Sequence, residues 1–92
     1  MRLLRAALVA LLVLAPLAAD AQEKKLVLIA GKRSHGPGDH EFRAGMMLLQ
    51  KCLAGVKGLK VVVESEGWVA DTKVFDGATA VALYSDGGGG NP

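Results

Sequence analysis

The chain has 92 residues, of which 11 are basic and 9 acidic, so its net charge is only +2. A nearly balanced charge and an aromatic content of 4% exclude the cationic, aromatic-lined surface that nucleic-acid binding requires. The single cysteine, Cys52, excludes an internal disulfide framework. The composition is that of an ordinary soluble protein, and we expect no nucleic acid among its partners.

Residues 1–21 have the pattern of a secretory signal peptide. Arg2 and Arg5 precede an apolar stretch of about 13 residues, shorter than the ~20 that a bilayer-spanning helix needs. The small-x-small sequence Ala-Asp-Ala at 19–21 is typical of a cleavage site. We predict a periplasmic or secreted protein with a mature chain of residues 22–92 and no membrane association after cleavage. An uncleaved anchor is the alternative.

A strand, a glycine-rich loop and a helix open the mature chain. Residues 25–30 are apolar at nearly every position, which favours a parallel strand covered on both faces. The loop 31–41 follows, in which Gly36 and Gly38 allow unusual backbone angles. An apolar stripe then recurs at helical spacing. Its members are Phe42, Met46, Leu49 and Leu53.

Polar residues and glycines mark the sides and ends of this helix. The side opposite the stripe should face water. That side carries Arg43, Gln50 and Lys51. Asp39 can cap the first turn with its carboxylate, and Gly55 and Gly58 supply the stop.

Two more strands complete the pattern. Residues 60–64 and 79–84 are short apolar runs, and the connector 65–78 between them has one short helical turn near 71–74. Parallel strands joined by crossovers predict an α/β doubly wound sheet. Three strands and one helix leave apolar surface open to water, so we interpret residues 22–92 as the amino-terminal part of a larger domain. A finished domain with a flexible glycine tail is the alternative.

The two-histidine loop and the glycine run together resemble the start of a ThuA-like domain. The matching segments are the strand 25–30, the Ser-His-Gly-Pro-Gly-Asp-His-Glu-Phe sequence of 34–42 with its helix, and the Tyr-Ser-Asp-Gly-Gly-Gly-Gly sequence of 84–90. The loop paired with the glycine run is the most specific part. The resemblance covers essentially all of the mature chain, but only the first part of such a domain.

The resemblance implies a class I glutamine amidotransferase-like fold, which is a flavodoxin-like doubly wound parallel sheet. Exported members with this loop are described as trehalose-utilisation or glycosyl-hydrolase-like proteins, so a carbohydrate or small polar metabolite is the implied ligand. Glutaminase activity is not implied, because the ThuA-like group usually lacks the cysteine nucleophile of the amidotransferases. The glycine run of the group is commonly followed by His, whereas this chain has Asn91.

His35, His40 and Asp86 are the candidate catalytic residues. Asp86 follows the third strand, so it should lie near the two-histidine loop if the first and third strands are adjacent. Imidazole is suited to proton transfer near neutrality. With Asp39 and Glu41 the histidines also offer ligands to zinc or a similar ion, although their five-residue spacing matches no metal signature and no cofactor is assigned. The alternative is that His40 packs at the helix start and His35 is solvated.

Five further residues are candidates for substrate binding. Lys32 and Arg33 can bind an anion beside the helix amino terminus, or they are solvated loop charges. Trp68 can stack on a sugar ring, or it closes an edge of the core. Gly87 and Gly88 let the backbone approach a ligand, or they permit a tight turn.

Two classes of function follow. One is an exported enzyme that acts on a carbohydrate or small polar metabolite. The other is a non-catalytic binding or accessory domain, with or without a divalent metal, that keeps the pocket but has no turnover.

Export gives the first testable prediction. Amino-terminal sequencing of the protein recovered from the periplasm or medium should begin at or next to Gln22, because the signal peptidase recognises the small residues before it. Intact Met1 on protein from the cytoplasmic fraction would contradict this prediction.

Overall fold

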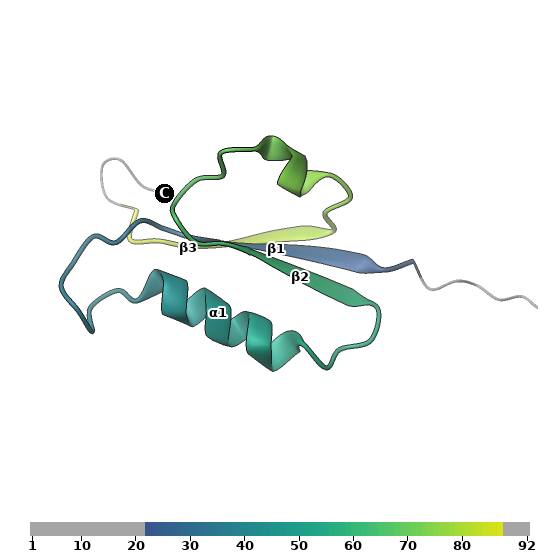
Figure 1. Ribbon diagram of the computed structural model, residues 1–92, viewed down its shortest axis with the longest axis horizontal. Helices are drawn as coiled ribbons and strands as arrows, with labels where there is room; N and C mark the ends of the chain where they lie inside the picture. The colour runs from purple at the N-terminus through teal and green to yellow at the C-terminus, as the bar shows by residue number, and fades with distance from the viewer. Residues whose placement is uncertain (1–21, 88–92) are drawn as a thin grey trace, which may run out of the picture.

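The computed structural model describes residues 22–87, and the predicted signal peptide lies outside this range (Figure 1). Five elements follow one another along the chain. They are β1 (Lys24–Ala30), α1 (Phe42–Leu53), β2 (Leu59–Glu64), the 3-10 helix η1 (Thr72–Phe75) and β3 (Ala80–Tyr84). Each predicted strand is present with its start shifted by one residue. Among the described residues, no helix has the length and apolar character needed to cross a membrane.

The three strands form a parallel sheet in the order β2-β1-β3, so β1 is central. Its last four residues, 27–30, are completely buried, which confirms the prediction of a strand covered on both faces. The continuous apolar run fits this position, because successive side chains of a strand point to opposite faces and both faces of β1 are covered.

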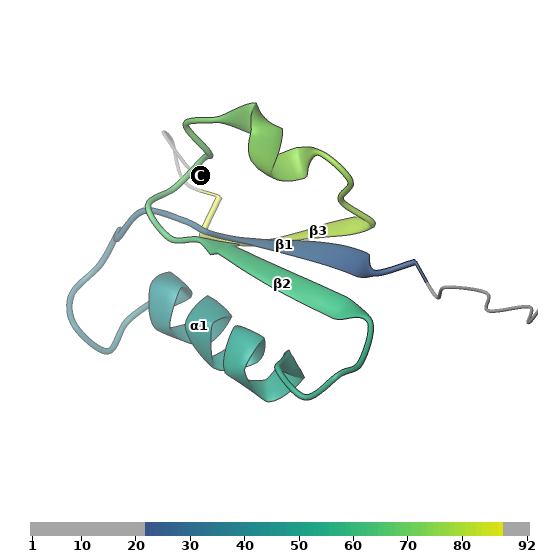
Figure 2. The same cartoon turned by 45° about the vertical axis from the view of Figure 1, so that its right-hand side comes forward.

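The register separates the core into two layers. Leu28 and Ala30 lie on one face and pack with Phe42 and Met46 of α1. Val27 and Ile29 lie on the other face and pack with Val69 of the connector. Figures 1 and 2 show α1 below the sheet and the segment that contains η1 above it.

The two crossovers therefore lie on opposite faces, and the architecture is a small α/β fold with a three-stranded parallel sheet and one helix.

The orientation of α1 corrects two expectations about its faces. Phe42 and Met46 are buried as predicted, but Leu49 is 40% exposed, and the prediction that it continues the stripe was wrong. Gln50 was expected to face water, yet its Nε2 donates a hydrogen bond to the Val61 carbonyl of β2 at 3.2 Å. The physical reason is that α1 packs against β1 and β2, so the helix face toward Gln50 lies over the sheet.

The start of α1 also differs from expectation. Glu41, not Asp39, is the N-cap residue, and no side chain caps the first turn. The Glu41 side chain instead turns back to the loop, where its Oε1 accepts a hydrogen bond from the Gly38 N–H at 2.8 Å. The end of α1 agrees with the predicted glycine stop, because Leu53 is the last helical residue and the C-cap Ala54 directly precedes Gly55. Gly58 adopts a left-handed φ of 73° just before β2.

Strand β3 is an edge of the described sheet and has an exposed apolar surface. Val81 and Leu83 are 48% and 50% exposed, although their neighbours in β1, Val27 and Ile29, are fully buried. This agrees with the expectation that three strands leave apolar surface open to water. The interpretation of the chain as part of a larger domain stays a prediction.

The difference in burial between two leucines gives a stability prediction. Leu28→Ala should lower the free energy of unfolding by about 2–5 kcal/mol, because it leaves a cavity among fully buried side chains. Leu83→Ala, the matched control at the exposed edge, should cost less than about 1 kcal/mol. Urea denaturation followed by circular dichroism measures both values. Equal losses for the two variants would show that β3 is buried in the protein in solution.

Candidate functional site

The loops that follow the three strands meet at one end of the sheet. The Gly31 N–H donates to the Tyr84 carbonyl at 2.8 Å, which joins the loop after β1 to the end of β3. The Gly67 N–H donates to the Ala30 carbonyl at 3.0 Å, which joins the segment after β2 to the same place. This end of the sheet lies where the crossovers change faces, which is where open α/β sheets bind ligands.

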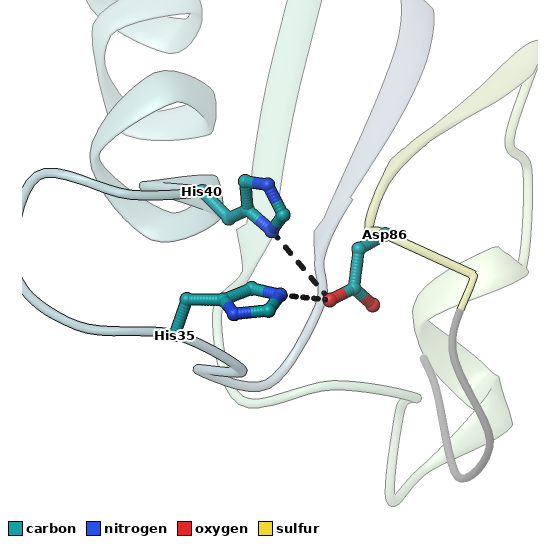
Figure 3. A group of neighbouring side chains, drawn as sticks. All are labelled: His35, His40 and Asp86. Atoms are coloured by element: carbon teal, nitrogen blue, oxygen red, sulfur yellow. Dashed lines mark ion pairs between the residues drawn. The ribbon is translucent and has the colours of Figure 1, made fainter.

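His35, His40 and Asp86 converge at this edge. Asp86 Oδ2 lies 3.4 Å from His35 Nε2 and 3.6 Å from His40 Nδ1. Figure 3 shows the two imidazoles pointing from the β1 loop to the same carboxylate oxygen. The structure thus places together the three residues that the sequence marked as candidates.

The three side chains differ in exposure. The imidazoles of His35 and His40 are 50% and 48% exposed, whereas the Asp86 side chain is only 17% exposed. The two rings stand edge to face, with centroids 4.2 Å apart. The carboxylate is therefore more sheltered from solvent than the two imidazoles that contact it.

Aromatic packing holds the end of β3 against α1. The rings of Phe42 and Tyr84 are T-shaped, with centroids 4.9 Å apart. Gly45 of α1 permits this packing, because a Cβ on it would lie 3.0 Å from Tyr84 Cε1. Tyr84 is two residues before Asp86, so this contact anchors the chain segment that carries the carboxylate.

The backbone at His40 is strained. His40 has a left-handed φ of 47° and is the one described non-glycine residue with positive φ. Such a conformation costs on the order of 1–3 kcal/mol, and such residues cluster at functional sites. Gly38 has a φ of 87°, as expected of an unusual loop glycine. Gly36 has no positive φ, so the corresponding expectation for Gly36 was wrong.

A cavity of about 320 Å³ opens on the β2 side of the cluster. Its wall combines backbone, both signs of charge, a hydroxyl, an imidazole and an aromatic ring. The lining residues are Gly31, Arg33, Asp39, His40, Glu41, Phe42, Arg43, Ser65 and Glu66. An ion pair between Arg43 and Glu66, at 3.6 Å and largely exposed, bridges α1 and the segment after β2. His40 belongs to both the cavity and the cluster.

The candidate binding residues are only partly gathered at this cavity. Arg33 lines it, whereas Lys32 is exposed outside its wall. Trp68 is 55% exposed and lies against Phe75, with ring centroids 5.7 Å apart. It therefore packs within the connector and does not line the cavity. Gly87 has a left-handed φ of 66° directly after Asp86, and Gly88 lies outside the described residues.

Sequence reasoning did not assign two of the cavity residues, Phe42 and Arg43, to a site. Ser65 and Glu66 follow β2, and parallel topology predicts that residues after β2 lie at the same edge as the two-histidine loop. The structure places both of them in the cavity wall. Arg43 carried no such signal, because its role at the rim depends on how α1 is placed over the sheet.

The cluster can perform two kinds of chemistry. The carboxylate can hold an imidazole in one tautomer and orientation, which suits proton transfer. The same nitrogen and oxygen atoms can also bind a cation. Comparison with protein-family models, with curated proteins and with solved structures finds no significant match for this chain.

The strained backbone at His40 gives a prediction that separates the effect of the backbone conformation on stability from the effect of the imidazole. Both His40→Gly and His40→Ala remove the imidazole, but only glycine relaxes the left-handed backbone. His40→Gly should therefore be more stable than His40→Ala by about 1 kcal/mol. Thermal or urea unfolding of the two purified variants measures the difference. An alanine variant as stable as the glycine variant would mean that residue 40 does not keep a positive φ in solution.

Proposed function

We propose that this protein is an exported ThuA-like protein with a flavodoxin-like, class I glutamine amidotransferase-like fold. Its carboxyl-edge site binds or acts on a carbohydrate or another small polar metabolite. His35, His40 and Asp86 form the centre of that site.

The convergence of these three residues carries the proposal. In flavodoxin-like sheets with the order 2-1-3-4-5, ligands bind at the reversal point between β1 and β3. The observed order β2-β1-β3 is compatible with the first part of that sheet. The two histidines follow β1 and Asp86 follows β3, so the cluster lies across that reversal point.

The chemistry of the cavity favours a small polar ligand. Its volume of about 320 Å³ is at the lower end of the range of about 300–1,000 Å³ found for ligand pockets. Arginine side chains can donate hydrogen bonds there, and carboxylates can accept them, so neighbouring hydroxyl groups of a sugar find both kinds of partner. The ring of Phe42 adds an apolar surface of the kind that packs against a sugar face.

The residues have distinct roles in this proposal. His40 contacts the ligand from the cavity wall and transfers a proton if the protein is an enzyme. Asp86 orients the imidazole of His40, and His35 contacts the same carboxylate oxygen. In a non-catalytic binding domain the same groups hold the ligand through hydrogen bonds alone.

The test is ligand binding by the purified protein. Calorimetric titration with trehalose, other disaccharides and monosaccharides should detect at least one ligand. His40→Ala and Asp86→Asn should each weaken its binding by about 10-fold or more, because they remove a charged or hydrogen-bonding partner at the site. Chromatography of the incubated sugar then separates an enzyme, which forms product, from a binding domain, which does not.

Lys51→Ala is the matched control, because Lys51 lies on the exposed side of α1 away from the cluster. It should leave affinity and stability unchanged. Absence of binding to every carbohydrate in the series, with the protein folded, would contradict a carbohydrate ligand. Binding that is unchanged in both site variants would contradict the assigned site.

A further inference from the structure

The distances around Asp86 differ from those of direct hydrogen bonds. An N–H donor normally lies about 2.7–3.2 Å from its oxygen acceptor. The Asp86 oxygen lies 3.4 and 3.6 Å from the two imidazole nitrogens. Both separations are longer than a direct hydrogen bond and shorter than would leave the groups out of contact.

A tetrahedral metal ion matches these separations. Zinc binds imidazole nitrogen and carboxylate oxygen at about 2.0–2.2 Å, which puts two ligands of a tetrahedral ion about 3.3–3.6 Å apart. Both nitrogen–oxygen separations in the cluster match that range, and all three ligand atoms lie within 4.8 Å of one another. Small rotations of two half-exposed imidazoles would complete the geometry.

We propose that His35 Nε2, His40 Nδ1 and the Asp86 carboxylate bind one divalent transition-metal ion, with zinc as the best match. Two nitrogens and one oxygen suit zinc and its neighbours, whereas calcium and magnesium prefer a shell of oxygens. Three protein ligands leave a coordination position open to water or a ligand, as in catalytic zinc sites. Because His40 also lines the cavity, a molecule bound there lies beside the metal site.

The fold explains how these ligands meet without a sequence signature. The two histidines belong to the loop after β1, whereas the carboxylate follows β3. Asp86 is 46 residues after His40 in the sequence. The hydrogen bond between Gly31 and Tyr84 ties the two segments together next to the cluster. The metal proposal rests on the proposed function only because both use the same residues. Metal binding can be measured with no sugar present.

The experiment uses zinc ion alone and untagged protein. Cys52 is exposed and its thiol is a competing zinc ligand, so every variant is made in a Cys52→Ser background. Isothermal titration of the metal-free protein should show one zinc ion per chain. His35→Ala, His40→Ala and Asp86→Ala should each weaken binding by more than about 10-fold.

Asp76→Ala is the matched control for the loss of a carboxylate. Asp76 is exposed beside η1, and the Lys25 Nζ that contacts it bonds its backbone carbonyl, so the substitution keeps that contact. Its zinc affinity should equal that of the background protein. Circular dichroism of each variant checks that the fold is retained.

Nitrogen NMR of the zinc-loaded background protein tests the assigned atoms without a substitution in the cluster. The resonances of His35 Nε2 and His40 Nδ1 should shift on zinc addition to those of metal-bound nitrogens. Absence of saturable binding, coordination through the other ring nitrogens, or binding that survives in all three folded variants would overturn the proposal.

The outcomes also separate this inference from the proposed function. Zinc binding by the three residues in a protein that binds no carbohydrate supports the metal site and contradicts the carbohydrate proposal. Carbohydrate binding that needs His40 and persists in chelator-treated protein, with no zinc binding, overturns the metal site and leaves the carbohydrate proposal standing.

Discussion

The burial of β1 is the constraint on which the rest of the structure depends. A strand buried on both faces cannot hydrogen-bond to water, so its backbone groups need partners on both edges. Parallel pairing with β2 and β3 supplies them and brings the carboxyl ends of all three strands to one edge. Hydrogen bonds from Gly31 to Tyr84 and from Gly67 to Ala30 continue this pairing past the strand ends. The site is thus a consequence of how the central strand satisfies its backbone.

Local packing converts this shared edge into a defined cluster. The contact between Phe42 and Tyr84, which the absence of a side chain at Gly45 permits, anchors the end of β3 to α1. The hydrogen bond from the Gly38 N–H to Glu41 Oε1 joins two residues of the loop on either side of His40. His40 has its left-handed backbone between them. The His40 residue that has this strained backbone also contacts Asp86 through its imidazole. Strained backbone conformations tend to occur at functional sites.

The cluster and the cavity are separate features that share one residue. Asp86 follows β3 and contacts His35, the cavity wall includes residues that follow β2, and His40 belongs to both the cluster and the cavity. A ligand in the cavity and a cation in the cluster would therefore be neighbours and would not compete for one volume. His40 and Asp86 take part in both the carbohydrate and the metal proposals, but sugar binding can be measured without zinc and zinc binding without sugar, so each proposal can fail alone.

The sequence by itself determined the strands, the helix, the short turn of η1 and the residues of the cluster. Apolar runs and glycine-rich loops are local signals, and parallel topology places strand-end residues on one edge. The faces of α1 depended on the tertiary structure, since Leu49 and Gln50 exchanged their expected environments when the helix packed toward β2. The same holds for the loop, where Glu41 and not Asp39 made the hydrogen bond, and for Trp68, which packed on Phe75. Spacing along one chain fixes which residues share a face, but only packing against other elements decides which face is covered.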